Sequence, residues 1–152
     1  MNDIVITNIS IYKAIAEDAF ENTIGADKQQ RAPKADGTGW IIKYDPSHVS
    51  FKNSIISVVF TGMWLEALTH LLIVQKFGEK KFLEYNFKSY EEKLKLLGIS
   101  DGGLLAKVKR FRETRKDLVH EKAHFDNGTI KTAQEEARLA HEIMDNINAK
   151  LG

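Results

Sequence analysis

Cysteine is absent from the 152-residue sequence, and proline occurs only twice. Without cysteine, disulfides, thiolate metal sites and cysteine nucleophiles are all excluded, and the composition suits a reducing cytoplasm. A strong net charge is missing as well, because 22 lysine and arginine residues nearly balance 21 aspartate and glutamate residues. The resulting net charge of +1 predicts no general attraction to nucleic acid, so any such attraction must be local.

Patterns typical of several enzyme classes and of exported proteins are also lacking. Gly102-Gly103 is not followed by a lysine-serine or lysine-threonine pair, so there is no phosphate-binding loop, and no serine lies in a nucleophile elbow. The first ten residues, MNDIVITNIS, carry an acid where a signal peptide would have lysine or arginine. The length fits one domain spanning residues 1–152, and a hydrophobic content of 43% is enough to fill its core.

One apolar stretch, residues 55–74, is about as long as a segment that spans a bilayer. Glu66 lies near its middle, where an acid costs about 2.5–3.5 kcal/mol on insertion scales, and His70 adds a second polar group. A helix that is apolar nearly all round is equally typical of the centre of a helical bundle. We therefore expect a buried helix and no membrane partner, in a protein of the cytoplasm.

Hydrophobic residues recur at helical spacing over most of the chain and predict an all-α fold. We expect helices over residues 4–24, 47–77, 89–98 and 101–125, and a last helix from residue 132 through residue 147. The expected capping residues are Ser47, Ser89 and Thr132, the last two in capping boxes. Residues 25–46 hold three glycines and both prolines, which predicts a long loop with room for a short β element and for an apolar run, Trp40-Ile41-Ile42, that covers a hydrophobic face. Together these elements predict an up-and-down bundle of four or five helices.

The helix over residues 101–125 carries a permanent cation on its apolar side. At about 100° per residue its large apolar residues fall within an arc of about 140°; these are Leu104, Leu105, Val108, Phe111, Leu118 and Val119. Arg115 projects from near the middle of this arc and Arg112 from its edge. Because arginine keeps its charge, a buried one must pair with an acid, reach water or face a ligand. Glu66 is the acid available for pairing, since no other acid lies between Asp45 and Glu79.

His120 follows Arg115 by five residues, which places the two about 140° apart around an ideal helix. They belong to a basic segment, because residues 107–116 contain six basic residues and one acid, Glu113, and so carry a local charge of +5. A solvated helix face is the plain alternative for such a run. A histidine with an ordinary pKa of about 6.5 can nevertheless exchange protons at neutral pH, and an arginine fork can hold two phosphate oxygens.

The segment Arg115-Lys116-Asp117-Leu118-Val119-His120 resembles the motif of the HEPN superfamily, an arginine followed a few residues later by a histidine, late in a helical bundle. The layout is also similar over residues 47–150, where a long apolar helix precedes the motif helix and one closing helix. Family members often place asparagine, aspartate or histidine directly after the arginine, whereas this chain has Lys116 there and Asp117 one place later. The resemblance implies a metal-independent endoribonuclease that needs no cofactor and acts as a homodimer. It also implies a toxin or defence system with a neutralising partner of nucleotidyltransferase type.

The resemblance and the residue chemistry together assign the site. His120 is expected to act as general acid and base, and Arg115 to stabilise the phosphoryl group during RNA cleavage. Arg112 and Lys116 are expected to hold the RNA backbone. Two further residues are expected to support this set: Glu66 and Asp117.

Other classes stay open at this stage. The same domain could be a catalytically silent module that holds RNA, a nucleotide or another protein, or a purely structural dimer in which Arg115 pairs with Glu66. Residues 120–124, HEKAH, also have the HExxH spacing that places His120 and His124 on one helical face, as zinc ligands are in metalloproteases. Because no third ligand is evident in a chain this short, we expect no metal site.

Overall fold

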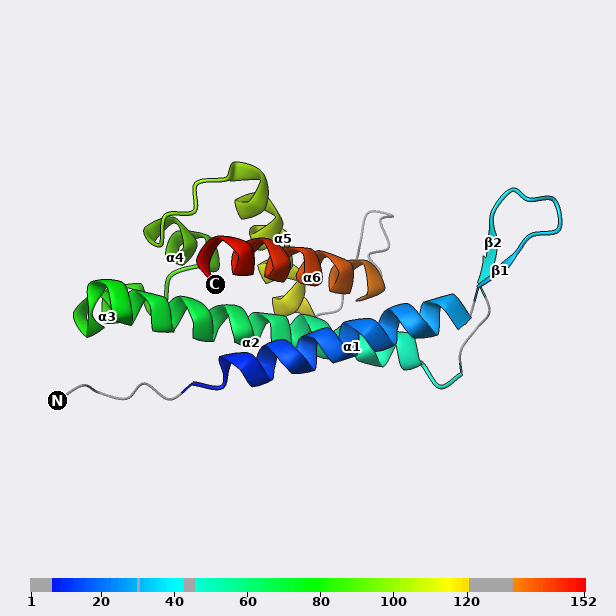
Figure 1. The fold of residues 1–152 in the computed structure, drawn as a ribbon, viewed down its shortest axis with the longest axis horizontal. Coiled ribbons are helices and arrows are strands. Elements are labelled where there is room, and N and C mark those ends of the chain that lie inside the picture. Colours follow the sequence, from blue (N-terminus) through cyan, green and yellow to red (C-terminus); the bar gives the residue numbers. More distant parts are fainter. Residues whose placement is uncertain (1–6, 30, 43–45, 121–132) are drawn as a thin grey trace.

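The structure, a computed structural model, describes residues 7–29, 31–42, 46–120 and 133–152. Within these ranges the chain forms six helices and one two-stranded antiparallel sheet (Figure 1). In chain order the elements are α1 (Ile9–Gln29), β1 (Arg31–Pro33), β2 (Trp40–Ile42), α2 (Val49–Phe77), α3 (Glu79–Tyr85), α4 (Tyr90–Leu96), α5 (Gly102–His120) and α6 (Ala133–Leu151). The prediction of an all-α bundle with a short β element is confirmed.

The helix ends agree with the prediction in some places and differ in others. Ser89 forms the predicted capping box with Glu92 at the start of α4. Capping of α2 by Ser47 was wrong: the helix begins after His48, whose carbonyl accepts the first helical hydrogen bond, from Lys52, and whose backbone is left-handed at a φ of 52°. The predicted helix end at residue 125 and the predicted cap at Thr132 lie outside the described residues.

α3 was not predicted at all. It has only seven residues, and none of them is buried. A helix without a buried face has no hydrophobic periodicity to reveal it in the sequence. It begins directly after Gly78, whose φ of 84° ends α2, because such a backbone conformation is readily available only to glycine.

The segment after α1 folds into a hairpin that extends from the end of the bundle (Figure 1). Arg31 lies opposite Ile42 and Pro33 opposite Trp40, so only three residue pairs join β1 to β2. The expectation that Trp40-Ile41-Ile42 covers a hydrophobic face was wrong, because Trp40 and Ile41 are exposed. α1 continues four residues past Gly25, through Gln29, and this extension carries the hairpin beyond the helices.

α1 and α2 pack against each other through small residues. The buried positions on α1 are Ala16, Ala19, Thr23 and Ala26, and those on the facing side of α2 are Ser50, Ser54, Ser57 and Thr61. The two rows recur every three or four residues, and they meet where the Thr23 hydroxyl lies 3.3 Å from the Ser54 hydroxyl. Small side chains allow two helix backbones to approach closely, so this contact brings the two helices together over much of the length of α1.

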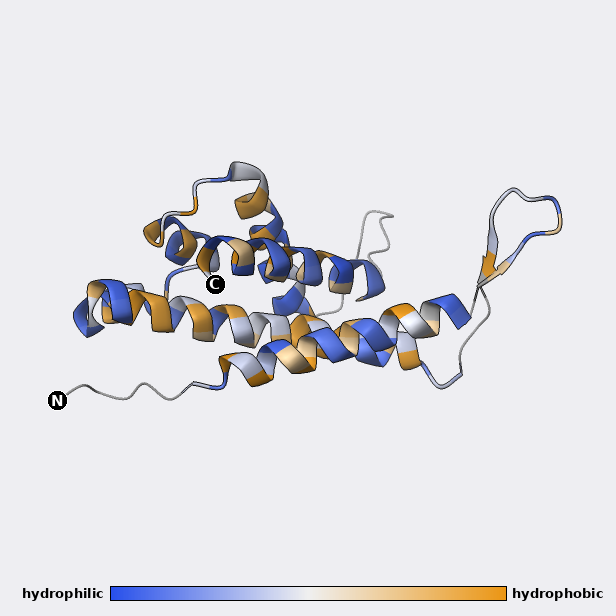
Figure 2. Ribbon diagram, in the orientation of Figure 1, coloured by the Kyte–Doolittle hydropathy of each residue, from blue (hydrophilic) through white to orange (hydrophobic). Residues whose placement is uncertain are grey.

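The remaining faces of α2 bury the large apolar side chains of the bundle. Trp64 and Leu65 of α2 pack with residues of α4, α5 and α6 in one core; the fully buried members include Leu94, Val108, Phe111, Ile143, Met144 and Ile147. Figure 2 shows hydrophobic residues, in orange, on every helix, with hydrophilic residues, in blue, between them, as expected for amphipathic helices. The apolar side of α5 therefore faces the core, as its periodicity predicts.

α2 is long and apolar enough to cross a membrane by length and composition alone. In its most apolar 18-residue window, 44% of the residues are buried inside the structure. Helices α1, α5 and α6 contact α2, and this packing is compatible with a soluble protein.

The close contact of α1 with α2 predicts that a larger side chain at a buried position of α1 destabilises the protein. Ala19→Leu should lower the free energy of unfolding by about 1–3 kcal/mol, because Ala19 is buried and a larger side chain there would overpack the interior. Ala14→Leu is the matched control: Ala14 is exposed on the same helix, so its replacement should change stability by less than about 0.5 kcal/mol. Urea unfolding of both variants measures the difference, and equal stabilities would contradict the close packing.

Candidate functional site

Arg115 lies across the surface of α2 at Gly62. A β-carbon built on Gly62 would be 2.1 Å from Nε of Arg115 and 2.3 Å from its Cδ. The arginine side chain thus occupies the space that any other residue at position 62 would need. Arg115 is half-buried, and Gly62 is buried beneath it.

The guanidinium of Arg115 has no acidic partner in the part of the chain that the structure describes. Its Nε is buried and donates no hydrogen bond. Glu66, the acid that the sequence offers for pairing, is exposed on α2 and forms no ion pair with it. A buried donor left without an acceptor costs about 1–3 kcal/mol, so the bundle retains an unfavourable group here.

Arg112, one turn earlier on α5, is held by an acid. Its Nε donates to Oε2 of Glu91 on α4 at 3.1 Å, and its Nη2 donates to Oε1 at 3.1 Å. This bidentate arrangement is the strongest form of an arginine–carboxylate contact. Binding of an RNA phosphate by Arg112 stays a prediction, and it would require the phosphate to share or displace Glu91.

Two polar residues of α2 lie on the same helix face as Gly62. Glu66 and His70 follow at intervals of four residues, so all three positions lie on one face of the helix. Opposite them, α4 contributes Tyr90 and Lys93, which are only 8% and 4% exposed. We call this group, completed by Arg112 and Arg115, the α2–α4–α5 seam.

The charges of the seam act on one another. Burial raises the pKa of Tyr90 above its ordinary value; the positive charges of Arg115 and Arg112 oppose this rise, and the carboxylate of Glu66 adds to it. Burial lowers the pKa of Lys93, against the effect of Glu66, and its Nζ donates to the backbone carbonyl of Asn86 at 3.1 Å. Buried ionisable groups with shifted pKa values, gathered in one place, are typical of functional sites.

Of the other predicted site residues, the structure describes the side chains of Lys116 and Asp117 but not that of His120. Lys116 is exposed and Asp117 is half-buried, both on α5 beside Arg115. His120 is the last residue of α5, but its side chain lies outside the described residues, as do residues 121–132. The alternative zinc pair, His120 and His124, is therefore not described either. Among the residues that are described, no three His, Asp or Glu side chains come together where they could hold a metal ion.

The sequence prediction missed Gly62, Tyr90 and Lys93. Gly62 could have been found, because glycine, an acid and a histidine recur every four residues on one face of an otherwise apolar helix. Tyr90 and Lys93 gave no such signal, since tyrosine is intermediate in burial and lysine is almost never fully buried.

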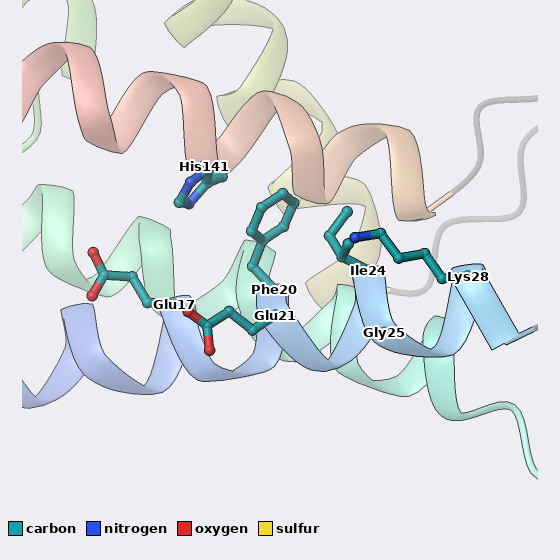
Figure 3. A pocket seen from close by; sticks show the side chains of 7 residues that line it. All are labelled: Glu17, Phe20, Glu21, Ile24, Gly25, Lys28 and His141. Atoms are coloured by element: carbon teal, nitrogen blue, oxygen red, sulfur yellow. The ribbon is translucent and has the colours of Figure 1, made fainter.

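A separate recess of about 630 Å³ lies between α1 and α6, on residues that the sequence prediction did not select (Figure 3). Figure 3 shows His141 of α6 beside Phe20 of α1, and their rings stack with centroids 4.2 Å apart. Nε2 of His141 also lies 3.3 Å from Oδ2 of Asp145. Each ring thus covers one face of the other, and this recess contains none of the seam residues.

A scan against protein-family models, a search of curated proteins and a search of solved structures each find no match for this chain. Its function is therefore inferred from the chemistry of the seam and of the motif beside it.

The surroundings of His70 predict a dependence of stability on pH. Its ring stacks on Phe82 at 3.5 Å between centroids, and its pKa is lowered, first by removal from water and then by the charge of Lys93, against the effect of Glu66. The unfolded chain therefore binds the proton more readily than the folded chain. The contribution of His70 to stability is present above about pH 6.5 and is lost as the pH falls through that value towards the folded pKa.

His70→Phe keeps an aromatic ring against Phe82 but cannot be protonated. Urea unfolding at pH 7.5 and at pH 5.5 should show that the variant gains stability relative to the wild type as the pH falls. A constant difference between the two proteins at both pH values would show that protonation of His70 is not linked to folding.

Proposed function

We propose that this protein is a metal-independent endoribonuclease of HEPN type, in which Arg115 stabilises the phosphoryl group and His120 transfers protons. The observation that carries the proposal is the guanidinium of Arg115, half-buried across Gly62 without an acidic partner among the described residues. A partly buried cation without an acceptor is unfavourable, and an anionic ligand would offset that cost.

The proposed reaction uses the ribose 2′-hydroxyl as nucleophile. A 2′-oxygen–phosphorus bond forms, the bond from phosphorus to the 5′-oxygen breaks, and one proton passes from the 2′-hydroxyl to the leaving oxygen. An imidazole can take up the first proton and return one to the leaving group. Negative charge grows on the non-bridging oxygens in the transition state, where a fixed guanidinium binds it most strongly.

The basic segment of α5 supports a local rather than a general attraction to RNA. Three of its six cations already pair with acids: Lys107 with Glu142, Arg110 with Glu136, and Arg112 with Glu91. In the described part of the chain the other three, Lys109, Arg115 and Lys116, have no ion pair. Of these three, Arg115 and Lys116 are adjacent within the motif, so they are the favoured phosphate contacts.

A second copy of the chain belongs to the proposal. Arg115 and His120 are about 140° apart on one helix, so a single α5 does not present both to the same phosphate. Two α5 helices paired across a two-fold axis would bring Arg115 of each copy towards His120 of the other. We further propose, from the resemblance alone, that the protein acts in the cytoplasm as a toxin or defence component. A nucleotidyltransferase-type protein would then neutralise it.

RNA degradation in excess chelator tests the assigned roles. His120→Ala and Arg115→Ala should each slow cleavage by at least about 100-fold, because each removes a group that acts in the transition state. Lys109→Ala, on the exposed side of α5, is the control and should retain cleavage within a few-fold. Circular dichroism confirms that each variant is folded. Undiminished cleavage by His120→Ala refutes the assignment, and salt-dependent RNA binding without cleavage by the wild type identifies a silent binding module.

The pairing of Arg112 predicts an effect on RNA affinity. Glu91→Gln removes the acid that holds Arg112, so a phosphate can bind that guanidinium without competition. The slope of log affinity against log salt concentration should steepen by about 0.7 for single-stranded RNA, the value for one additional phosphate contact. Glu79→Gln, an exposed acid on α3, is the control for the change in net charge. Equal slopes for the two variants would remove Arg112 from the RNA-binding set.

A further inference from the structure

We infer that Gly62 is a positioning residue: the bare helix surface at this glycine is the seat that fixes the guanidinium of Arg115 for an anionic ligand. The inference rests on the proposed function where it concerns RNA. The seat itself is a matter of packing and can be tested without any ligand.

The conformation of α2 does not require glycine at position 62. Gly62 lies in the middle of a 29-residue helix and is not among the described glycines with positive φ, which are Gly37, Gly39, Gly78 and Gly98. Glycine in a helix interior is less stable than alanine, because it loses more conformational freedom on folding. What glycine provides at this position is therefore the lack of a side chain.

The neighbour that needs this space is Arg115. Besides the contacts below 2.5 Å with Nε and Cδ, a β-carbon at Gly62 would lie 3.0 Å from Cζ. α5 cannot withdraw to make room, because Val108 and Phe111 anchor it in the core with no exposed surface. Any side chain at position 62 must therefore push the guanidinium of Arg115 out of its seat while the helices stay in place.

Gly25 offers a matched comparison within the same protein. It also lies inside a long helix, α1, but a β-carbon added there would meet nothing within 4 Å. The two glycines share a backbone conformation and differ in whether a neighbouring side chain fills the space beside them.

The test is a thermal double-mutant cycle with Gly62→Ala, Arg115→Ala, the double variant and Gly25→Ala. Gly62→Ala should lower Tm by about 5 °C or more, since it displaces a packed side chain. In the Arg115→Ala background the same change should be neutral or raise Tm by about 2 °C, as should Gly25→Ala in the wild type. If Gly62→Ala does not fold but the double variant does, the inference holds. An equal loss of Tm in both backgrounds, or failure of the double variant to fold, overturns it.

The kinetics of RNA cleavage provide a second measurement, which a purely structural role of Gly62 would leave unchanged. Gly62→Ala, assayed well below its Tm, should lower kcat at least 10-fold and change KM less than threefold. The double variant should be no slower than Arg115→Ala alone. If Gly62→Ala cleaves like the wild type, Gly62 does not position Arg115. If the wild type cleaves no RNA, the proposed function fails, while the thermal cycle still decides whether Gly62 seats Arg115.

Discussion

The bundle depends on α2, which has to pack against every other helix that the structure describes. α2 contacts α1, α3, α4, α5 and α6, and the residues on its different sides differ in kind. Small hydroxyl residues meet α1, large apolar residues fill the core, and the row of Gly62, Glu66 and His70 lies on the side of α4 and α5. The composition of α2 follows from this constraint, because serine, threonine and glycine are poorer helix formers than alanine or leucine but allow close packing.

Three arginines on α5 illustrate how differently a bundle can hold the same charge. Arg110 donates at 2.6 Å to Glu136, a buried carboxylate whose second oxygen has no hydrogen bond, and Arg112 is gripped by Glu91. Arg115 lies against Gly62 of α2 and has no acidic partner among the residues that the structure describes. A paired arginine is satisfied by the fold, whereas an unpaired one keeps its capacity for an outside anion. Because of this contrast within one helix, the proposal of a phosphate ligand rests on Arg115 and not on the general basicity of the segment.

A helical bundle by itself says little about function, since the same architecture serves binding, catalysis and assembly. The proposal therefore depends on the chemistry of one face. Tyr90 is nearly buried, and the charges of Arg115 and Arg112 act on its pKa, so this part of the face is shielded from water. In such surroundings a guanidinium interacts more strongly with an anion than it does in open solvent. The same burial makes any misplaced charge costly, so the geometry at Gly62 matters more here than it would on an open surface.

Much of the fold was determined locally and could be read from the sequence. The long helices follow from apolar residues at helical spacing, the start of α4 from the Ser89 capping box, and the inward side of α5 from the arc on which Arg115 lies. α3 was not predicted, because a seven-residue helix with no buried residue has no hydrophobic periodicity. The hairpin was predicted only as a short β element. These failures share a cause: neither segment buries a face that a periodic sequence would reveal.

The sequence by itself determined that a permanent cation sits on the apolar side of the penultimate helix, because helical periodicity alone places it there. Only the tertiary structure decided that Glu66 does not pair with this cation, that Glu91 binds Arg112, and that Gly62 lies under Arg115. Those relations join residues 21 to 53 positions apart in the chain. Ion pairs and close contacts over such separations depend on how the helices pack, and no local pattern encodes the packing.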